Sequence, residues 1–205
     1  MALDYTTLTG AKTVTNSIRS WVNHSAIPAS DILTEAEAYI YERVRAWEMR
    51  QEASISAASG GSVFTLPTDF LAPIKLLLDG HHHMGLTYLH EELFVASKDE
   101  DGELYESAWP NYWTIMGEQG LLDVKLTETR NGDLWYYQRP EALSGSNTTN
   151  FLTVKFPTLL RRTCTMFGYE YRKDWQAFER ELILVEGAIE RANQHADSVR
   201  RGAEW

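Results

Sequence analysis

The sequence predicts an α+β protein: a helical bundle built from N-terminal and C-terminal helix pairs, with an inserted antiparallel β-rich subdomain. Two observations lead to this prediction. The pattern is helical over residues 5–45, rich in strands and turns over residues 46–140, and helical again over residues 157–200. In the last helix, apolar residues three or four positions apart form one stripe: Trp175, Phe178, Leu182, Val185, Ile189, Ala192, Ala196 and Val199.

The same change of pattern predicts the domain division. We expect residues 1–45 and 151–200 to form a discontinuous helical domain, residues 46–150 a β-rich insertion, and residues 201–205 a C-terminal tail. With 205 residues and 43% hydrophobic content, the chain can bury a core as one domain or as two small subdomains.

Two helices are expected before the insertion. The first runs over residues 5–23, and Pro28 prevents its continuation. Ser30 or Asp31 then caps a second helix, whose acidic residues come early and basic residues late, as the helix dipole favours.

The insertion begins with a half-buried strand over residues 47–55, where apolar and polar residues alternate. A turn at residues 58–62 leads to a returning strand at 63–66, and an interior strand at 74–78 ends at Asp79 and Gly80. A short strand at 86–89 and a short helix at 90–97 are expected next.

The second half of the insertion contains two predicted hairpins. Residues 112–116 and 121–126 flank a turn at 117–120. Asn131 and Gly132 form the pair favoured in a two-residue type I′ turn, which would join a strand ending near Arg130 to one at 133–138. A polar linker at 144–150 then leads to a helix that starts at Pro157 and turns at Lys173 and Asp174 into the last helix.

Charge and composition narrow the possible functions. The formal net charge of −10 disfavours tight sequence-reading DNA binding, whereas an acidic surface would let DNA slide past. We expect a soluble protein made in the cytoplasm, because neither a signal peptide nor an apolar run long enough to span a membrane is evident. The single cysteine, Cys164, lies in an apolar helical stretch, and its thiol is expected to be packed against neighbouring side chains.

Residues suited to catalysis or metal binding occur without the spacing that such sites need. His81, His82 and His83 are consecutive, with His90 nearby, and a polar loop is favoured over a metal site. The acidic segment 99–103 has its glycine too early for a calcium loop, and Gly60 and Gly61 lack the other parts of a phosphate loop. We therefore expect a protein that is not an enzyme, with no catalytic residue, cofactor or metal.

Aromatic residues crowd the strand region, and three interpretations of them remain open. They could fill a thin core, form a protein interface, or make a carbohydrate platform. The residues concerned are Trp109, Tyr112, Trp113, Trp135, Tyr136 and Tyr137. Of these, Trp109, Tyr112 and Trp113 are the candidates for an interface.

The last residues form a second candidate interface. Arg200, Arg201, Glu204 and Trp205 show no core pattern, yet the segment ends in a large apolar side chain. Such a tail is either frayed or a hook that becomes ordered on a partner.

The order of segments from about residue 5 to residue 195 resembles that of the tail adaptor, or head-to-tail connector, proteins of tailed bacteriophages. The resemblance rests on four strings that occur in the right order: Phe64-Thr65-Leu66-Pro67-Thr68-Asp69-Phe70-Leu71, Tyr112-Trp113-Thr114-Ile115 before a glycine-bounded turn, Tyr136-Tyr137-Gln138-Arg139-Pro140-Glu141-Ala142-Leu143-Ser144, and Asn147-Thr148-Thr149-Asn150-Phe151-Leu152 leading into Phe156-Pro157-Thr158-Leu159-Leu160. Arg161 and Arg162 depart from the pattern, because that helix is usually more apolar.

The resemblance implies a structural virion protein of the tail or neck that forms a dodecameric homo-oligomer ring. Such a ring joins the portal protein to the tail nozzle and tail fibre proteins, and double-stranded DNA passes through its lumen without sequence-specific binding. It also implies that Arg200, Arg201, Glu204 and Trp205 grip the portal, while the strand region, with Trp109, Tyr112 and Trp113, faces the tail.

Two other functions remain as alternatives. The aromatic strands and scattered acids such as Glu91 and Glu92 would suit a carbohydrate-binding or glycan-hydrolysing virion protein. A DNA-binding helical module is disfavoured by the charge.

Overall fold

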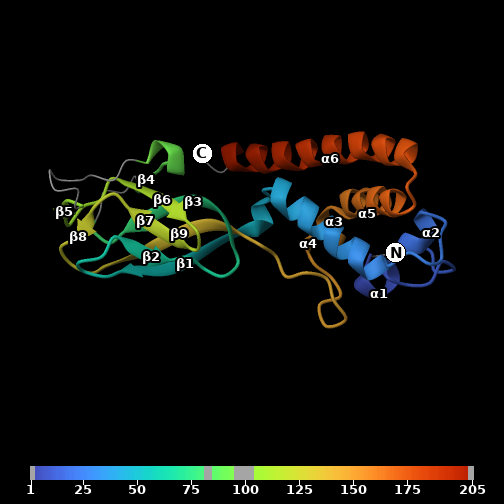
Figure 1. Cartoon of the computed structure of the whole chain (residues 1–205), viewed down its shortest axis with the longest axis horizontal. Coiled ribbons are helices and arrows are strands. Elements are labelled where there is room, and N and C mark those ends of the chain that lie inside the picture. The colour runs from blue at the N-terminus through green and yellow to red at the C-terminus, as the bar shows by residue number, and fades with distance from the viewer. Residues whose placement is uncertain (1–2, 81–84, 95–103, 203–205) are drawn as a thin grey trace. The chain divides into compact units, whose positions relative to one another are not determined.

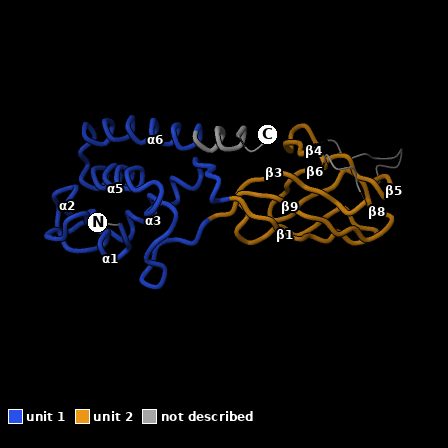
Figure 2. The backbone as a smooth tube through the Cα atoms, turned by 180° about the vertical axis from the view of Figure 1, so that it is seen from behind, with its two compact units in different colours: residues 1–49, 140–205 blue, residues 50–139 orange. Residues whose placement is uncertain are grey.

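The computed structural model describes residues 3–80, 85–94 and 104–202 of the chain, and beyond Gln194 it describes only the helical backbone (Figure 1). The chain divides into two compact units (Figure 2). Residues 1–49 and 140–205 form unit 1, and residues 50–139 form unit 2. Unit 1 is helical and unit 2 is built from strands, which confirms the mixed α+β class. The 140–150 segment, expected in the β-rich part, belongs to unit 1.

Unit 1 contains six α-helices in its described part: α1 (Tyr5–Leu8), α2 (Ile18–Trp21), α3 (Ala29–Arg43), α4 (Phe151–Lys155), α5 (Pro157–Tyr171) and α6 (Trp175–Gly202). The 3-10 helix η1 (Trp47–Met49) follows α3. Helix α5 packs against both α3 and α6. Helix α3 also reaches α6, because the Tyr39 hydroxyl donates to Glu186 and the Asn193 side-chain amide donates to the Arg43 carbonyl at 3.0 Å.

The prediction of a single helix over residues 5–23 is wrong, because two short helices, α1 and α2, lie there instead. Asp4 caps α1 by accepting a hydrogen bond from the Thr7 amide at 2.7 Å. Ser17 caps α2 by accepting one from the Ser20 amide at 3.1 Å. Between them Asn16 adopts a positive φ of 71°, which a continuous right-handed helix does not allow.

The second expected helix is confirmed as α3, but its predicted cap is wrong. Neither Ser30 nor Asp31 caps it, since the helix already begins at Ala29 and its N-cap residue, Pro28, makes no side-chain capping bond. The apolar face is buried, with Ile32, Ala36 and Ile40 at most 3% exposed. Fully burying an isoleucine contributes about 1.5–3 kcal/mol, so this face holds α3 in unit 1.

Three helices follow the 140–150 segment, and the first of them was not expected. A capping box starts α4: the Asn150 side chain accepts from the Thr153 amide, and the Thr153 hydroxyl accepts from the Asn150 amide. The start of α5 at Pro157 and the corner at Lys173, whose φ is +58°, are confirmed.

The apolar stripe of α6 is buried in its middle, at Val185, Ile189 and Ala192. Its first residue, Trp175, is 56% exposed. The side chains of Ala196 and Val199 lie outside the described residues.

Unit 2 contains nine strands in its described part: β1 (Arg50–Ala57), β2 (Val63–Thr65), β3 (Phe70–Leu78), β4 (Thr87–Tyr88), β5 (Glu106–Ser107), β6 (Tyr112–Met116), β7 (Gln119–Leu122), β8 (Lys125–Leu126) and β9 (Arg130–Gln138). They form sheets of order β1-β9-β3, β2-β7-β6-β4 and β5-β8. The 3-10 helix η2 (Glu91–Leu93) lies where a short helix was expected at 90–97, and residues 95–97 lie outside the described part.

The type I′ turn predicted at Asn131 and Gly132 is wrong, because both residues lie inside β9. Gly132 is paired with Ile55 of β1 on one side and with Leu78 of β3 on the other. A Cβ atom at Gly132 would lie 2.0 Å from the Leu77 carbonyl oxygen. Glycine is therefore needed here for close approach of two backbones and not for a turn.

The strand predicted at 74–78 was expected to be interior to its sheet. This is also wrong, because it forms part of β3, which is an edge strand next to β9. Pro73 fits this place, since proline has no amide proton to donate to a neighbouring strand and is therefore tolerated at an edge. The register of β3 against β9 shifts on either side of Ala72 and Pro73. At the other edge, the first residue of β1, Arg50, is paired with Tyr137 near the end of β9.

The hairpin expected from residues 112–116 and 121–126 is present as β6 and β7, but its turn contains only Gly117 and Glu118, and residues 125–126 form the separate strand β8. Strand β2 follows the expected turn but pairs with β7 and not with β1. The apolar side chains that these strands turn inward form the core of unit 2: Ile55, Ala57, Phe64, Leu66, Leu76, Leu78, Leu86, Trp113, Leu122, Leu126, Leu134 and Tyr136.

Candidate functional site

The three aromatic residues expected at an interface lie in two different environments. Trp109 and Tyr112 are each 44% exposed, whereas Trp113 is 0% exposed. Tyr112 and Trp113 are consecutive in β6, so their side chains point to opposite faces of the sheet. Trp113 packs edge-on against Tyr88, with ring centroids 5.1 Å apart. The expectation that Trp113 contacts a partner is therefore corrected: it supports β6 from inside the core.

Trp109 is held in place by its neighbours. The Arg130 guanidinium lies over the indole ring, 4.0 Å from its centroid, and donates a hydrogen bond to the Asp79 carbonyl at 3.1 Å. The Trp109 amide donates to the Ser107 hydroxyl at 3.0 Å. A half-exposed aromatic ring that is already fixed loses little entropy when it binds, which suits an interface residue.

Tyr112 belongs to an apolar strip on the outer face of the β2-β7-β6-β4 sheet. Val63 and Thr114 both pair with Leu121, so these three residues lie on the same face of the sheet. Residues 112 and 116 lie two positions before and after Thr114 in β6, and they therefore share that face. We define the outer strip as Tyr112, Met116, Val63 and Leu121; Met116 is 51% exposed and Val63 43%. The sequence analysis did not single out Val63 and Met116, although their alternation with the buried Phe64 and Trp113 could have indicated them.

Of the remaining clustered aromatics, Tyr136 belongs to the unit 2 core. Tyr136 is 4% exposed, stacks on Phe70 with centroids 5.6 Å apart, and donates its hydroxyl to Asp69 at 2.9 Å. Burial, followed by the hydrogen bond to Asp69, raises the pKa of Tyr136 to about 12. Trp135 and Tyr137 are half-buried.

The residues considered for metal binding and catalysis form no such site within the described part of the chain. No three histidine, cysteine or acidic side chains gather there as ligands. His81, His82, His83 and the 99–103 segment lie outside the described residues, and His90 is exposed. Cys164 is fully buried as expected, and burial and then the charge of Glu37 raise the pKa of its thiol. An uncharged buried thiol is a poor nucleophile.

A buried carboxylate, Glu37, joins α3 to the 140–150 segment. Glu37 is 2% exposed and accepts hydrogen bonds from the Leu143 amide at 3.0 Å, the Asn150 side-chain amide at 2.7 Å and the Tyr41 hydroxyl at 3.0 Å. Burial raises the pKa of Glu37, and these hydrogen bonds lower it in part. Because its partners all belong to unit 1, this network stabilises the helical unit.

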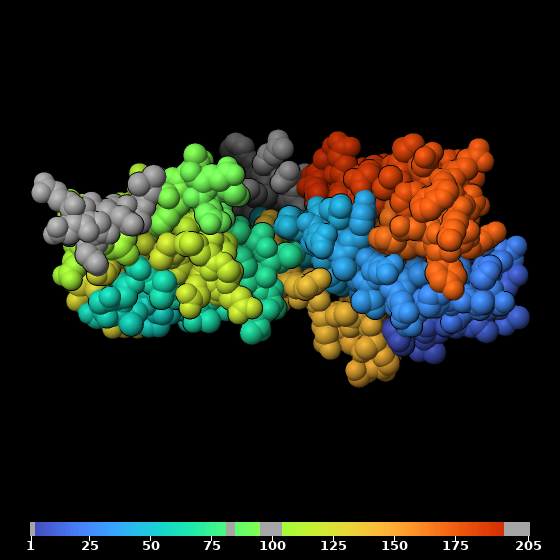
Figure 3. Space-filling model, viewed as in Figure 1, coloured from blue at the N-terminus to red at the C-terminus, as the bar shows by residue number. Residues whose placement is uncertain are grey.

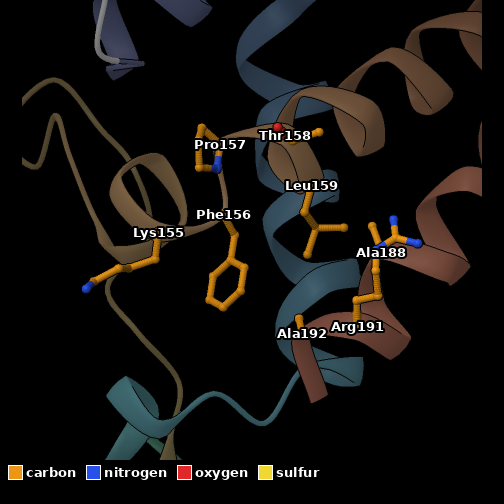
Figure 4. A pocket seen from close by; sticks show the side chains of 8 residues that line it. All are labelled: Lys155, Phe156, Pro157, Thr158, Leu159, Ala188, Arg191 and Ala192. Carbon is orange, nitrogen blue, oxygen red and sulfur yellow. The ribbon is translucent and has the colours of Figure 1, made fainter. Parts of the chain in front are cut away.

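Unit 1 has a hollow between the α4–α5 link and α6, which we call the α5–α6 hollow. Its volume is about 280 Å³. Figure 4 shows Phe156 and Leu159 extending toward Ala192 and Arg191 of α6. The lining is mostly apolar with two cations: Lys155, Phe156, Pro157, Thr158, Leu159, Ala188, Arg191 and Ala192.

A second hollow, which we call the α3–α5 hollow, lies between the first half of α3 and the end of α5. Its volume is about 470 Å³, and its charged residues are all acidic. It is lined by Pro28, Asp31, Ile32, Glu35, Phe167, Glu170 and Tyr171. In Figure 3 the light-blue surface of α3 adjoins the orange surface of the α5–α6 corner, consistent with the packing of α3 on α5.

Of the four residues expected to grip a portal, Arg200 and Arg201 lie within α6, where the structure describes the backbone alone. Glu204 and Trp205 lie outside the described residues. Their role stays a prediction.

Among the described residues, the helices are all too short or too polar to span a membrane. The sequence matches the family model described as SU10 adaptor protein over residues 9–203, which includes nearly all of both units. No curated protein matches the chain.

Proposed function

Because the chain belongs to the SU10 adaptor protein family, a family of structural phage adaptors, we propose that it is a ring subunit joining the portal to the tail nozzle. The observation that carries the proposal is the extent of the match, which runs through the helical unit and the inserted β-rich unit alike. The ring is dodecameric and lies in the neck of the virion, where tail fibre proteins are further neighbours.

The proposed mechanism is geometric and not catalytic. Copies pack head to tail, and such heterologous contacts close into a ring only when each rotation fits. Double-stranded DNA passes through the lumen. The net charge of −10 supports this part of the proposal, because an acidic wall repels phosphates and does not hold the DNA.

The two ends of the ring would use different surfaces of each subunit. Arg200, Arg201, Glu204 and Trp205 grip the portal above. Trp109, Tyr112 and the rest of the outer strip contact the tail below, which is supported by their exposure and by the fixed position of the Trp109 ring.

Negative-stain imaging of the chain mixed with its phage's portal tests this function. We expect rings seated on the portal, and portals that stay bare would contradict the proposal. A chain that ends after Arg200 should form few seated rings, because it lacks three of the four gripping residues, Arg201, Glu204 and Trp205. Unchanged seating of the truncated chain would mean that the tail is not the hook.

Replacing Trp109 with alanine should weaken binding to the tail nozzle at least about tenfold, since a buried aromatic anchor contributes about 2 kcal/mol or more to an interface. Binding can be measured by co-sedimentation of assembled rings with nozzle protein. Tyr105→Ala is the matched control, because Tyr105 is another half-exposed aromatic of unit 2. Loss of glycan-array binding instead of nozzle binding would favour a carbohydrate-binding protein.

A further inference from the structure

Two surfaces of unit 1 carry charged side chains that form no ion pair among the described residues. At the α5–α6 hollow, Lys155 and Arg191 are exposed, and neither forms an ion pair within the described part of the chain. The floor between them is apolar and includes Phe156, Leu159 and Ala192. Leu184, one helical turn before Ala188, is 44% exposed and extends this apolar surface along α6.

The α3–α5 hollow has the opposite character. Glu35 and Glu170 are exposed, and among the described residues neither has a basic partner. Tyr171, which is 52% exposed, adds a large aromatic side chain to the edge of the hollow. This surface therefore presents two unpaired carboxylates and an aromatic ring.

The two hollows lie at opposite ends of α5, and α6 completes one of them while α3 completes the other. The Tyr39 hydroxyl donates to Glu186 of α6, and the Tyr39 ring contacts Phe167, which lines the α3–α5 hollow. Since each residue advances an α-helix by about 100°, Arg191 is rotated about 140° from Glu186, and Ala188 about 200°. The side of α6 that lines the α5–α6 hollow is thus turned away from the side that faces Tyr39.

Opposite charges at two separate sites of one subunit allow identical subunits to meet in a repeated contact. A chain with a net charge of −10 repels its own copies, so a close contact between copies needs a local cationic patch facing carboxylates. We propose that the α5–α6 hollow of one copy binds the acidic, aromatic edge of the α3–α5 hollow of the next copy. In this contact Lys155 and Arg191 pair with Glu35 and Glu170, and Tyr171 covers the apolar floor. The inference rests on the proposed ring function and names its subunit contact.

A nucleic acid is the other occupant that cations could attract, but it fits this surface less well. Two cations flank the hollow, and the apolar floor formed by Phe156, Leu159, Ala188 and Ala192 offers nothing to a phosphate backbone. An acidic protein surface with an exposed aromatic ring matches both parts of the hollow.

Charge reversal in the full-length chain tests the contact. A base-reversed variant carries Lys155→Glu and Arg191→Glu, and an acid-reversed variant carries Glu35→Lys and Glu170→Lys. A combined variant carries all four changes. The control carries Lys12→Glu and Arg161→Glu, which are exposed and line neither hollow. Rings on the portal are counted by negative stain, self-association is followed by sedimentation velocity, and thermal unfolding verifies that each variant is folded.

Each double variant should lose the rings and weaken self-association at least about tenfold, whereas the combined variant and the control should assemble. Mixing the two double variants should restore rings in which the two variants alternate, because one of the two junctions between them has the wild-type charges and the other has the swapped charges of the combined variant. Rings formed by either double variant, or none formed by the combined variant, would overturn the contact while leaving the ring function in place. Absence of wild-type rings would overturn both. Weaker binding of duplex DNA by the base-reversed variant, with assembly unchanged, would assign the cations to DNA.

Discussion

Replacing Gly132 with alanine is expected to destabilise the protein by at least about 3 kcal/mol, a large part of the stability of a typical domain. Gly132 lies in β9, between β1 and β3, where an added Cβ would approach the Leu77 carbonyl oxygen to 2.0 Å and the Leu78 Cα to 2.9 Å. Both atoms belong to the backbone of the neighbouring strand, so a rotamer change cannot relieve the clash. The strands must separate, and their hydrogen bonds weaken.

Chemical denaturation followed by circular dichroism measures this effect. Gly145→Ala is the matched control, because a Cβ at Gly145 meets no atom within 4 Å and the backbone there does not require glycine. The control should change the free energy of unfolding by less than about 0.5 kcal/mol. A Gly132→Ala protein as stable as the control would mean that β3 and β9 are not as close as described.

The second large effect is expected at Glu37. Glu37→Ala should lower the free energy of unfolding by about 3–5 kcal/mol, since it leaves the Leu143 amide and the Asn150 side chain as buried donors without their acceptor. Denaturation of the wild type and the variant gives the difference. Glu186→Ala is a suitable control, because that glutamate is exposed and its loss should cost much less. Equal losses of unfolding free energy in Glu37→Ala and Glu186→Ala would contradict the stabilising role of the buried Glu37 network.

Glu37 should also make stability depend on pH. Burial raises its pKa above the unfolded value near 4.5, so the folded state binds the proton more tightly than the unfolded state does. Its contribution to stability is therefore fully present below about pH 4.5 and is lost as pH rises through the raised pKa. Glu37→Gln removes the titrating group, so its unfolding free energy should lack this decline. Identical pH slopes in the two proteins would contradict the pKa shift.

The elements that sequence patterns predicted well are those with long, regular periodicity. Helix α6 follows its apolar stripe, and α5 begins at Pro157 as expected. Residues 5–23 have apolar residues at helical spacing too, but the caps at Asp4 and Ser17 and the positive φ of Asn16 divide them. In this segment, local side-chain hydrogen bonds outweighed a short hydrophobic pattern.

Gly132 shows why the strand order was harder to predict. An Asn-Gly pair favours a turn by its local conformational preference, but here the glycine serves a contact with Leu77, more than fifty residues away in the sequence. The need for close packing between two distant backbone segments leaves no pattern in the sequence around Gly132. The pairing of β2 with β7 in place of β1 depends in the same way on partners far along the chain.

The candidate interfaces were predictable only where one strand determines exposure. Alternation along β6 separates Tyr112 from Trp113 once the inward face is known, but the sequence does not tell which face that is. The two hollows were not predictable, because each is formed by helices that are distant in the sequence. Lys155 and Arg191 carry no motif that would bring them together.

The pairing of Arg50 with Tyr137 has a consequence for how such proteins can diversify. The polypeptide enters and leaves unit 2 on neighbouring strands, with Cα atoms separated by roughly 5 Å, the spacing of directly paired residues. A module whose two termini are adjacent can be exchanged for another, or replaced by a short loop, without stretching the helices that flank it. The β-rich module can therefore vary between relatives while the helical unit keeps its fold.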